Sequence, residues 1–133
     1  MSDAADLLAR EARSLVERLR LWTPERWAAS PGYPASPFAS RADLAHHLAQ
    51  WFVAQAGETD QPLPRLDSDL ALPDQLAVTA DDLVRARPEL AASACAHLLV
   101  HRTDLLGEAI PPGLAADLDV GDVVALGRAV CPG

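Results

Sequence analysis

Two histidines, His97 and His101, stand four residues apart in the stretch ELAASACAHLLVHRTDLL, which begins at Glu89. The stretch is typical of a helix, and four residues is slightly more than one helical turn, so both imidazoles project from one face. That face is otherwise apolar. Two imidazoles that point into a helical core are either core histidines satisfied by a carbonyl or carboxylate, or ligands of a metal ion. A third histidine on a facing helix would favour the metal.

His46 and His47 offer that third histidine. Neighbouring helical residues differ by about 100° around the axis, so only one of the two can face the core. His47 shares its side with apolar residues, whereas His46 leans toward the polar side of the same segment. We therefore predict that His47, His97 and His101 form a three-ligand metal site whose fourth position stays open, as catalytic sites require. Imidazole suits several divalent metals, and zinc or nickel is the expected one.

Apolar residues at helical spacing predict the elements that position these side chains. The predicted helices run from Ser2 or Asp3 to Leu21, from Ser40 to Gly57, from Pro73 to Arg87 and from Leu90 to Leu106, with a further short helix within Leu114 to Val130. Proline-containing loops are expected at 30–40 and 58–72, and a break at Pro88. No segment alternates as a strand would. The sequence thus predicts one domain, 1–133, an all-α antiparallel four-helix bundle with a short additional C-terminal helix.

The charge and composition of the chain exclude several classes of protein. All eleven basic residues are arginine, which fits the codon bias of a GC-rich genome, and the net charge is −8. Thirteen acids face five arginines after Phe52, so a nucleic-acid partner is not expected. With no signal-like N-terminus, no long apolar run and only Cys95 and Cys131, we expect a cytoplasmic protein without membrane spans or disulfides.

Three side chains near the histidines need separate interpretation. Cys95 lies about 160° around the helix from His97, so it is a poor ligand for the same site and fits a small buried hydrophobe. Trp51 and Phe52 fit the core, although one of them could line the mouth of a pocket. These readings leave the three histidines as the ligand set.

Two segments resemble the motifs of a known superfamily. DLAHHLA, from Asp43, and HLLVHRTDL, from His97, resemble the two motifs of the DinB-like superfamily of metal-binding four-helix bundles, and more closely its mycothiol-dependent maleylpyruvate isomerase branch. The matching residues are Asp43 and His47 in the first motif and His101, Asp104 and Leu105 in the second. His97 stands where that branch has glutamate, and histidine is the usual residue in the wider superfamily.

The resemblance implies a function as well as a fold. It implies a divalent-metal-dependent transferase or isomerase that acts on a small-molecule substrate through a low-molecular-weight thiol such as mycothiol, bound as its thiolate. Asp104 would orient an imidazole, or would be a surface acid paired with Arg102 or Arg128. The alternative is a non-enzymatic helical bundle that serves as a binding or dimerisation module. Bundles of this size often form homodimers, so a homodimer is a further possibility for this chain.

Overall fold

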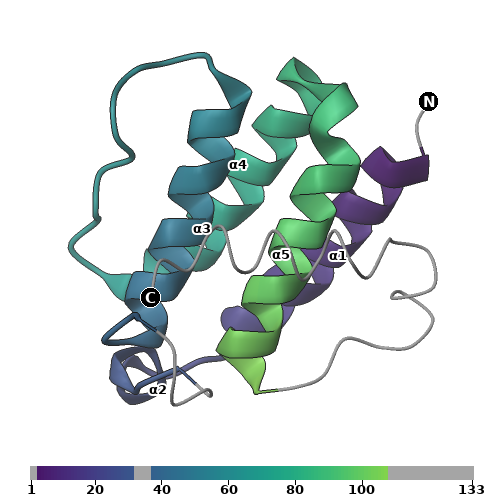
Figure 1. The fold of residues 1–133 in the computed structure, drawn as a ribbon. Helices are drawn as coiled ribbons and strands as arrows, with labels where there is room; N and C mark the ends of the chain where they lie inside the picture. The colour runs from purple at the N-terminus through teal and green to yellow at the C-terminus, as the bar shows by residue number, and fades with distance from the viewer. Residues whose placement is uncertain (1–2, 32–36, 108–133) are drawn as a thin grey trace.

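The computed structural model describes residues 3–31 and 37–107, which form helices and loops without a strand. Four long helices dominate, namely α1 (Asp3–Leu19), α3 (Arg41–Ala56), α4 (Leu72–Ala86) and α5 (Ala91–Leu106) (Figure 1). The shorter elements are α2 (Pro24–Ala28) and the 3₁₀ turns η1 (Asp69–Ala71) and η2 (Pro88–Leu90). The all-α prediction is confirmed, whereas the helix predicted within 114–130 lies outside the described residues.

Local signals set the helix boundaries close to their predicted positions. The Ser40 hydroxyl accepts a hydrogen bond from the backbone N–H of Asp43 at 3.1 Å, which satisfies a free donor at the start of α3. Gly57 ends α3 with a φ of +69°, a left-handed conformation that glycine adopts without steric cost. Pro88 separates α4 from α5, because proline cannot continue the backbone hydrogen bonding of α4.

The long helices pack as neighbours in a ring, with α1 and α3 each contacting both α4 and α5. Ion pairs show their directions. Arg20, just after α1, bonds Asp74 in the first turn of α4 at 2.9 Å, so α1 and α4 are antiparallel. Arg65 bonds Asp43 in the first turn of α3 at 2.8 Å and Asp69 of η1 at 3.1 Å, so α4 begins beside the start of α3.

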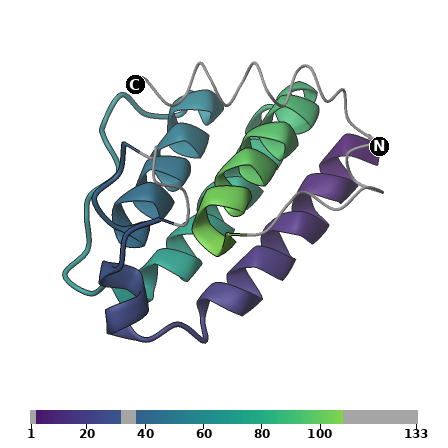
Figure 2. The ribbon, with the colours of Figure 1, turned by 60° about the horizontal axis from the view of Figure 1, so that its bottom comes forward.

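Helices α3 and α4 therefore run in the same direction, and so do the neighbours α1 and α5, so the antiparallel prediction is wrong for these two pairs (Figures 1 and 2). The reason is the connection at 57–68, which runs back along the whole length of α3. A 16-residue helix is about 24 Å long, and twelve extended residues reach about 40 Å, so the loop is long enough for this return. Antiparallel packing holds for α1 with α4 and for α3 with α5.

Two side chains of α3 hold the returning loop through one residue. His46 Nε2 donates a hydrogen bond to the carbonyl of Leu63 at 3.1 Å, and the N–H of Leu63 donates to Gln50 Oε1. His46 and Gln50 are one helical turn apart, so together they satisfy both backbone polar groups of Leu63. This contact explains how a loop without secondary structure is fixed against α3.

The core lies between the four long helices and consists mainly of leucine and alanine. Its largest fully buried side chains are Trp27, Phe52, Leu8, Leu15, Leu19, Leu44, Leu48, Leu76, Leu83, Leu98, Leu99 and Leu105. Trp27 comes from α2, which covers the end of the bundle where α3 begins. Within the described residues, no helix has the length and apolar character needed to cross a membrane.

Candidate metal centre

The three predicted ligands lie together between α3 and α5. His47 comes from the second turn of α3, and His97 and His101 come from successive turns of α5, which runs antiparallel to α3. One potential ligand nitrogen of each histidine lies within 4.8 Å of those of the other two. His97 and His101 are fully buried, and His47 is the member that keeps partial exposure. The structure thus brings together the three residues that the sequence predicts, from positions 50 residues apart.

His46 points away from this cluster, as its helical position indicates. Its Nε2 donates a hydrogen bond to the carbonyl of Leu63 in the loop that follows α3. His46 therefore has a structural contact of its own, and the choice of His47 over His46 agrees with the geometry.

Most of the ring nitrogens in the cluster are buried without a hydrogen-bond partner. These nitrogens are Nε2 of His47, both ring nitrogens of His97 and Nε2 of His101. A buried polar atom without a partner costs about 1–3 kcal/mol, so four in one place need an explanation. An ion bound by lone pairs of the three imidazoles would supply the missing interaction.

A backbone contact selects the tautomer of His101. Its Nδ1 lies 3.0 Å from the carbonyl oxygen of His97, one turn earlier in α5. A carbonyl can only accept, so Nδ1 carries the proton and Nε2 presents a lone pair toward the cluster. This is the arrangement that a metal-binding imidazole requires, with one nitrogen held by a carbonyl and the other free.

Two aromatic rings enclose the cluster. Trp51 stacks on His97 with ring centroids 3.8 Å apart and planes 12° apart, and Phe38 packs on His47 at 4.9 Å. His47 and Trp51 are four residues apart on α3, so the helical spacing signals that they share a face. The side chain of Phe38 comes from the loop before α3, and no periodic signal could place it there.

Burial keeps the histidines neutral at physiological pH. Desolvation, together with the neighbouring imidazoles, lowers the pKa of His97 to about 2. Burial lowers the pKa of His101 to about 4, although the hydrogen bond to the His97 carbonyl opposes that change. Desolvation also lowers the pKa of His47. Neutral imidazole is the form that binds a metal, so no proton has to be displaced near pH 7.

Within the described residues, Asp104 neither hydrogen-bonds to an imidazole nor pairs with Arg102. Arg102 pairs with Glu11 of α1 at 3.3 Å rather than with Asp104. Asp104 is partly buried, which raises its pKa, and within the described residues its carboxylate makes no hydrogen bond to an imidazole. The orientation of His101 comes from the His97 carbonyl, and a role for Asp104 at this site stays a prediction. Arg128 lies outside the described residues.

The two cysteines contribute nothing to the cluster. Cys95 is fully buried, and its burial raises the pKa of the thiol to about 12, so it stays protonated. This agrees with its interpretation as a small buried hydrophobe. Cys131 lies outside the described residues.

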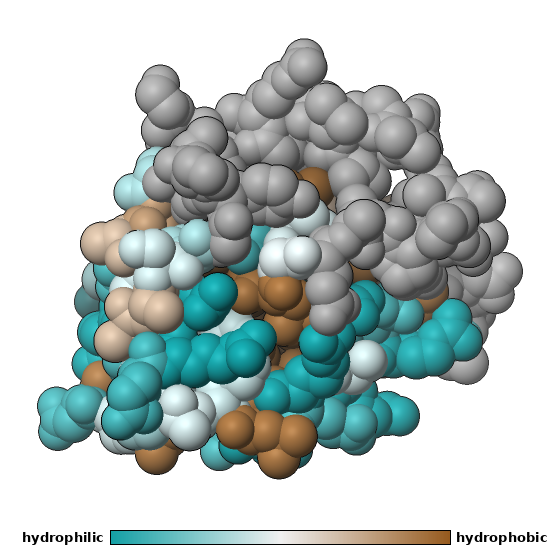
Figure 3. Space-filling model, turned by 90° about the horizontal axis from the view of Figure 1, so that it is seen from below, coloured by the Kyte–Doolittle hydropathy of each residue, from teal (hydrophilic) through white to brown (hydrophobic). Residues whose placement is uncertain are grey.

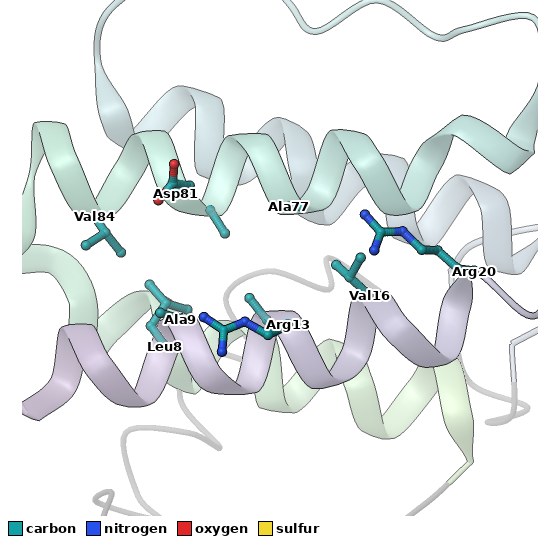
Figure 4. A pocket seen from close by; sticks show the side chains of 10 residues that line it. Leu8, Ala9, Arg13, Val16, Arg20, Ala77, Asp81 and Val84 are labelled. Carbon is teal, nitrogen blue, oxygen red and sulfur yellow. The ribbon is translucent and has the colours of Figure 1, made fainter.

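Two hollows elsewhere on the surface are separate from the histidines. One, of about 230 Å³, lies between α1 and α4, where Leu8, Ala9 and Val16 face Ala77 and Val84 (Figure 4). The other, of about 310 Å³, lies between α3, the loop after it and α4. Neither is lined by a histidine.

Comparison of the chain with protein-family models, with curated proteins and with solved structures found no match. The case for a metal centre therefore depends on the chemistry of the donor set. Three neutral imidazoles with unpaired, convergent nitrogens could hold a divalent transition-metal ion.

Proposed function

We propose that His47, His97 and His101 bind one divalent metal ion, zinc or nickel, in a DinB-like four-helix bundle. The observation that carries this proposal is the group of buried imidazole nitrogens without hydrogen-bond partners. The long loop after α3 returns along that helix, so α4 runs parallel to α3 and α5 runs antiparallel to it. Helices α3 and α5 carry the two motifs and contact each other, and this contact supports the bundle.

We further propose that the protein is a metal-dependent transferase or isomerase that uses a low-molecular-weight thiol, such as mycothiol, on a small molecule. The chemistry that the bound metal would supply is activation of that thiol as its thiolate at the position left open by three protein ligands. Support comes from the motif residues Asp43, His47, His101, Asp104 and Leu105.

The protein's own residues have defined parts in this proposal. Trp51 and Phe38 exclude water from two sides of the imidazoles. The partly exposed His47 marks the side from which a thiol could approach. Asp104, three residues after His101, is the motif acid that would orient an imidazole when the metal is bound.

Cobalt substitution tests the metal site and the thiol together. Cobalt bound by three imidazoles should give visible absorption bands, and an added thiol should add a sulfur-to-cobalt charge-transfer band in the near ultraviolet. His101→Ala should abolish both signals, and His46→Gln should retain both because Gln can still donate to the Leu63 carbonyl. Cobalt bands that persist unchanged in His101→Ala would refute the assigned site. Cobalt binding without any thiol band would refute the thiol chemistry alone, and the chain would then fit a binding module.

A further inference from the structure

Two arginines at the end of the molecule that carries α2 have no acidic partner in the part of the chain that the structure describes. Five other arginines form ion pairs within the described residues, namely Arg20, Arg65, Arg85, Arg87 and Arg102. Arg26 of α2 and Arg41 at the start of α3 form none there, and neither do Arg10 and Arg13 of α1. Figure 3 views this end, where hydrophilic residues dominate the described surface and hydrophobic groups lie among them. In a chain with a net charge of −8, uncompensated positive charge at one place is unexpected.

One tryptophan holds both guanidinium groups. The Cζ atom of Arg26 lies 4.7 Å from the ring centroid of Trp22, and that of Arg41 lies 5.7 Å from it. Trp22 is itself buried and packs edge-on against the fully buried Trp27 at 4.8 Å. The indole is therefore a fixed platform. Stacking on a ring positions a guanidinium but leaves its N–H donors available to an acceptor.

The two charges disfavour each other in the absence of an anion. Burial and the charge of Arg26 together lower the pKa of Arg41. The Nε atom of Arg41 is buried and has no hydrogen-bond partner. Desolvated guanidinium groups in proteins are normally paired with an acid. An anion that accepts from both arginines would remove the repulsion and satisfy the buried donor.

An open hollow of about 410 Å³ adjoins Arg26 and Trp22 and is lined by Arg18, Leu21, Trp22, Thr23 and Arg26. Arg41 is not among the lining residues and is connected to the hollow through the indole of Trp22. Leu21 is 84% exposed, the highest exposure among the large hydrophobic residues that the structure describes. The surface thus offers positive charge beside an exposed apolar side chain. It suits an anion that is attached to an apolar body.

We propose that Arg26 and Arg41, held on Trp22, form a binding site for a phosphate group whose apolar substituent contacts Leu21. A phosphate monoester carries about −1.5 to −2 charges near pH 7, which matches two guanidiniums, and its oxygens accept bidentate bonds from arginine. The phosphate group could belong to a soluble ester or to a lipid headgroup. This site is separate from the histidine cluster and does not depend on a bound metal.

Titration of the full chain with octyl phosphate and with inorganic phosphate, followed by calorimetry, tests the site. Octyl phosphate should bind more tightly than inorganic phosphate because of Leu21. Arg26→Gln and Arg41→Gln should each weaken binding about tenfold, as expected for loss of one charge-assisted hydrogen bond. Arg85→Gln is the matched control, because Arg85 is an exposed arginine paired with Asp81 on α4, and it should bind like the wild type.

The exposed position of Arg26 makes Arg26→Gln safe for folding, even if Arg41→Gln proves unstable. Equal affinity of Arg26→Gln and the wild type, or no saturable binding of octyl phosphate at millimolar concentration, would overturn the proposal. Vesicles of phosphatidylcholine with and without phosphatidic acid then distinguish the source. If the protein sediments with phosphatidic acid vesicles, and does so less in Arg26→Gln and Leu21→Ser, the phosphate group belongs to a lipid headgroup. Octyl phosphate binding without sedimentation assigns a soluble ester.

Discussion

At the scale of single residues, the histidine cluster combines burial with missing hydrogen bonds. The His97 carbonyl fixes the Nδ1 proton of His101 and leaves its Nε2 without a protein partner. His97 has neither ring nitrogen paired, and its ring is held by Trp51 instead. If positions 97 and 101 served packing alone, leucine would stabilise the fold better than histidine, because unpaired buried nitrogens reduce stability. The cluster therefore has the properties of a binding site.

The buried imidazoles should make the stability of the metal-free protein depend on pH. The pKa of His101 is about 4 in the folded protein and near 6.5 when the chain unfolds, so the unfolded chain binds the proton more readily. The free energy of unfolding should therefore fall as pH drops below about 6.5 and keep falling toward pH 4, by about 1 kcal/mol per pH unit for each such histidine. Urea unfolding in EDTA at a series of pH values measures this.

His97→Leu provides the comparison for that series. The pKa of His97 is lowered to about 2, so its contribution has the same sign and extends to lower pH. Between about pH 6 and pH 5, the free energy of unfolding should fall less steeply in the leucine variant than in the wild type. The difference in slope should be about 1 kcal/mol per pH unit. Identical slopes for the two proteins would mean that His97 is not kept neutral by burial.

At the scale of the elements, α3 positions both the cluster and the loop that returns along it. One face of α3 carries His47 and Trp51 toward α5, and another carries His46 and Gln50 toward Leu63. Arg65 adds a contact from the loop to Asp43 at the start of the same helix. The helix thus connects the cluster to the part of the chain that sets the direction of α4.

Gln50→Ala should loosen this loop. The N–H of Leu63 would lose its acceptor, so the free energy of unfolding should fall by about 1 kcal/mol. Trypsin should also cut faster after Arg65, which mass spectrometry of the early fragments can measure. Gln55→Ala is the matched control, since Gln55 is on the same helix and makes no hydrogen bond among the described side chains. Equal cutting in the two variants would contradict the role given to Gln50.

The ion pair of Glu11 with Arg102 should contribute measurably to the packing of α1 on α5. Their side chains are only 11% and 15% exposed, so removing one partner leaves a charge in a poorly solvated place. Glu11→Ala and Arg102→Ala should each cost about 2 kcal/mol, and a double-mutant cycle should give a coupling of about 1 kcal/mol or more.

The exposed pair of Arg20 with Asp74, which joins α1 to α4, serves as the reference for this cycle. Its coupling should be smaller, about 0.2–1 kcal/mol, because both groups are well solvated. A coupling for Glu11 with Arg102 no larger than that of the exposed pair would show that burial does not strengthen it.

At the scale of the whole molecule, local signals predicted the helices and the histidine cluster, but not the path of the chain. Ser40, Gly57 and Pro88 mark helix ends through capping and backbone chemistry that act over a few residues. The loop at 57–68 carries no such signal, because its direction depends on contacts of Leu63 and Arg65 with α3 that form only in the folded chain. The partner of Arg102 lies 91 residues away and has no local signal either.

A metal bound between α3 and α5 should stabilise the fold as a whole. A ligand that binds only the folded state adds about 2.7 kcal/mol to the free energy of unfolding at a free concentration of 100 times Kd. Zinc should therefore raise the Tm of the wild type, and EDTA should lower it again. His101→Ala should show no such shift. A shift of equal size in that variant would place the zinc elsewhere.

The most direct test of the account is the metal content of the purified protein, measured by elemental analysis after loading with zinc and removal of the excess. The wild type and His46→Gln should each retain about one equivalent, because three imidazoles supply one zinc site. His101→Ala, with one ligand removed, should retain none. A wild-type protein that holds no zinc after loading, or a His101→Ala variant that holds as much as the wild type, would contradict the metal centre and the function proposed from it.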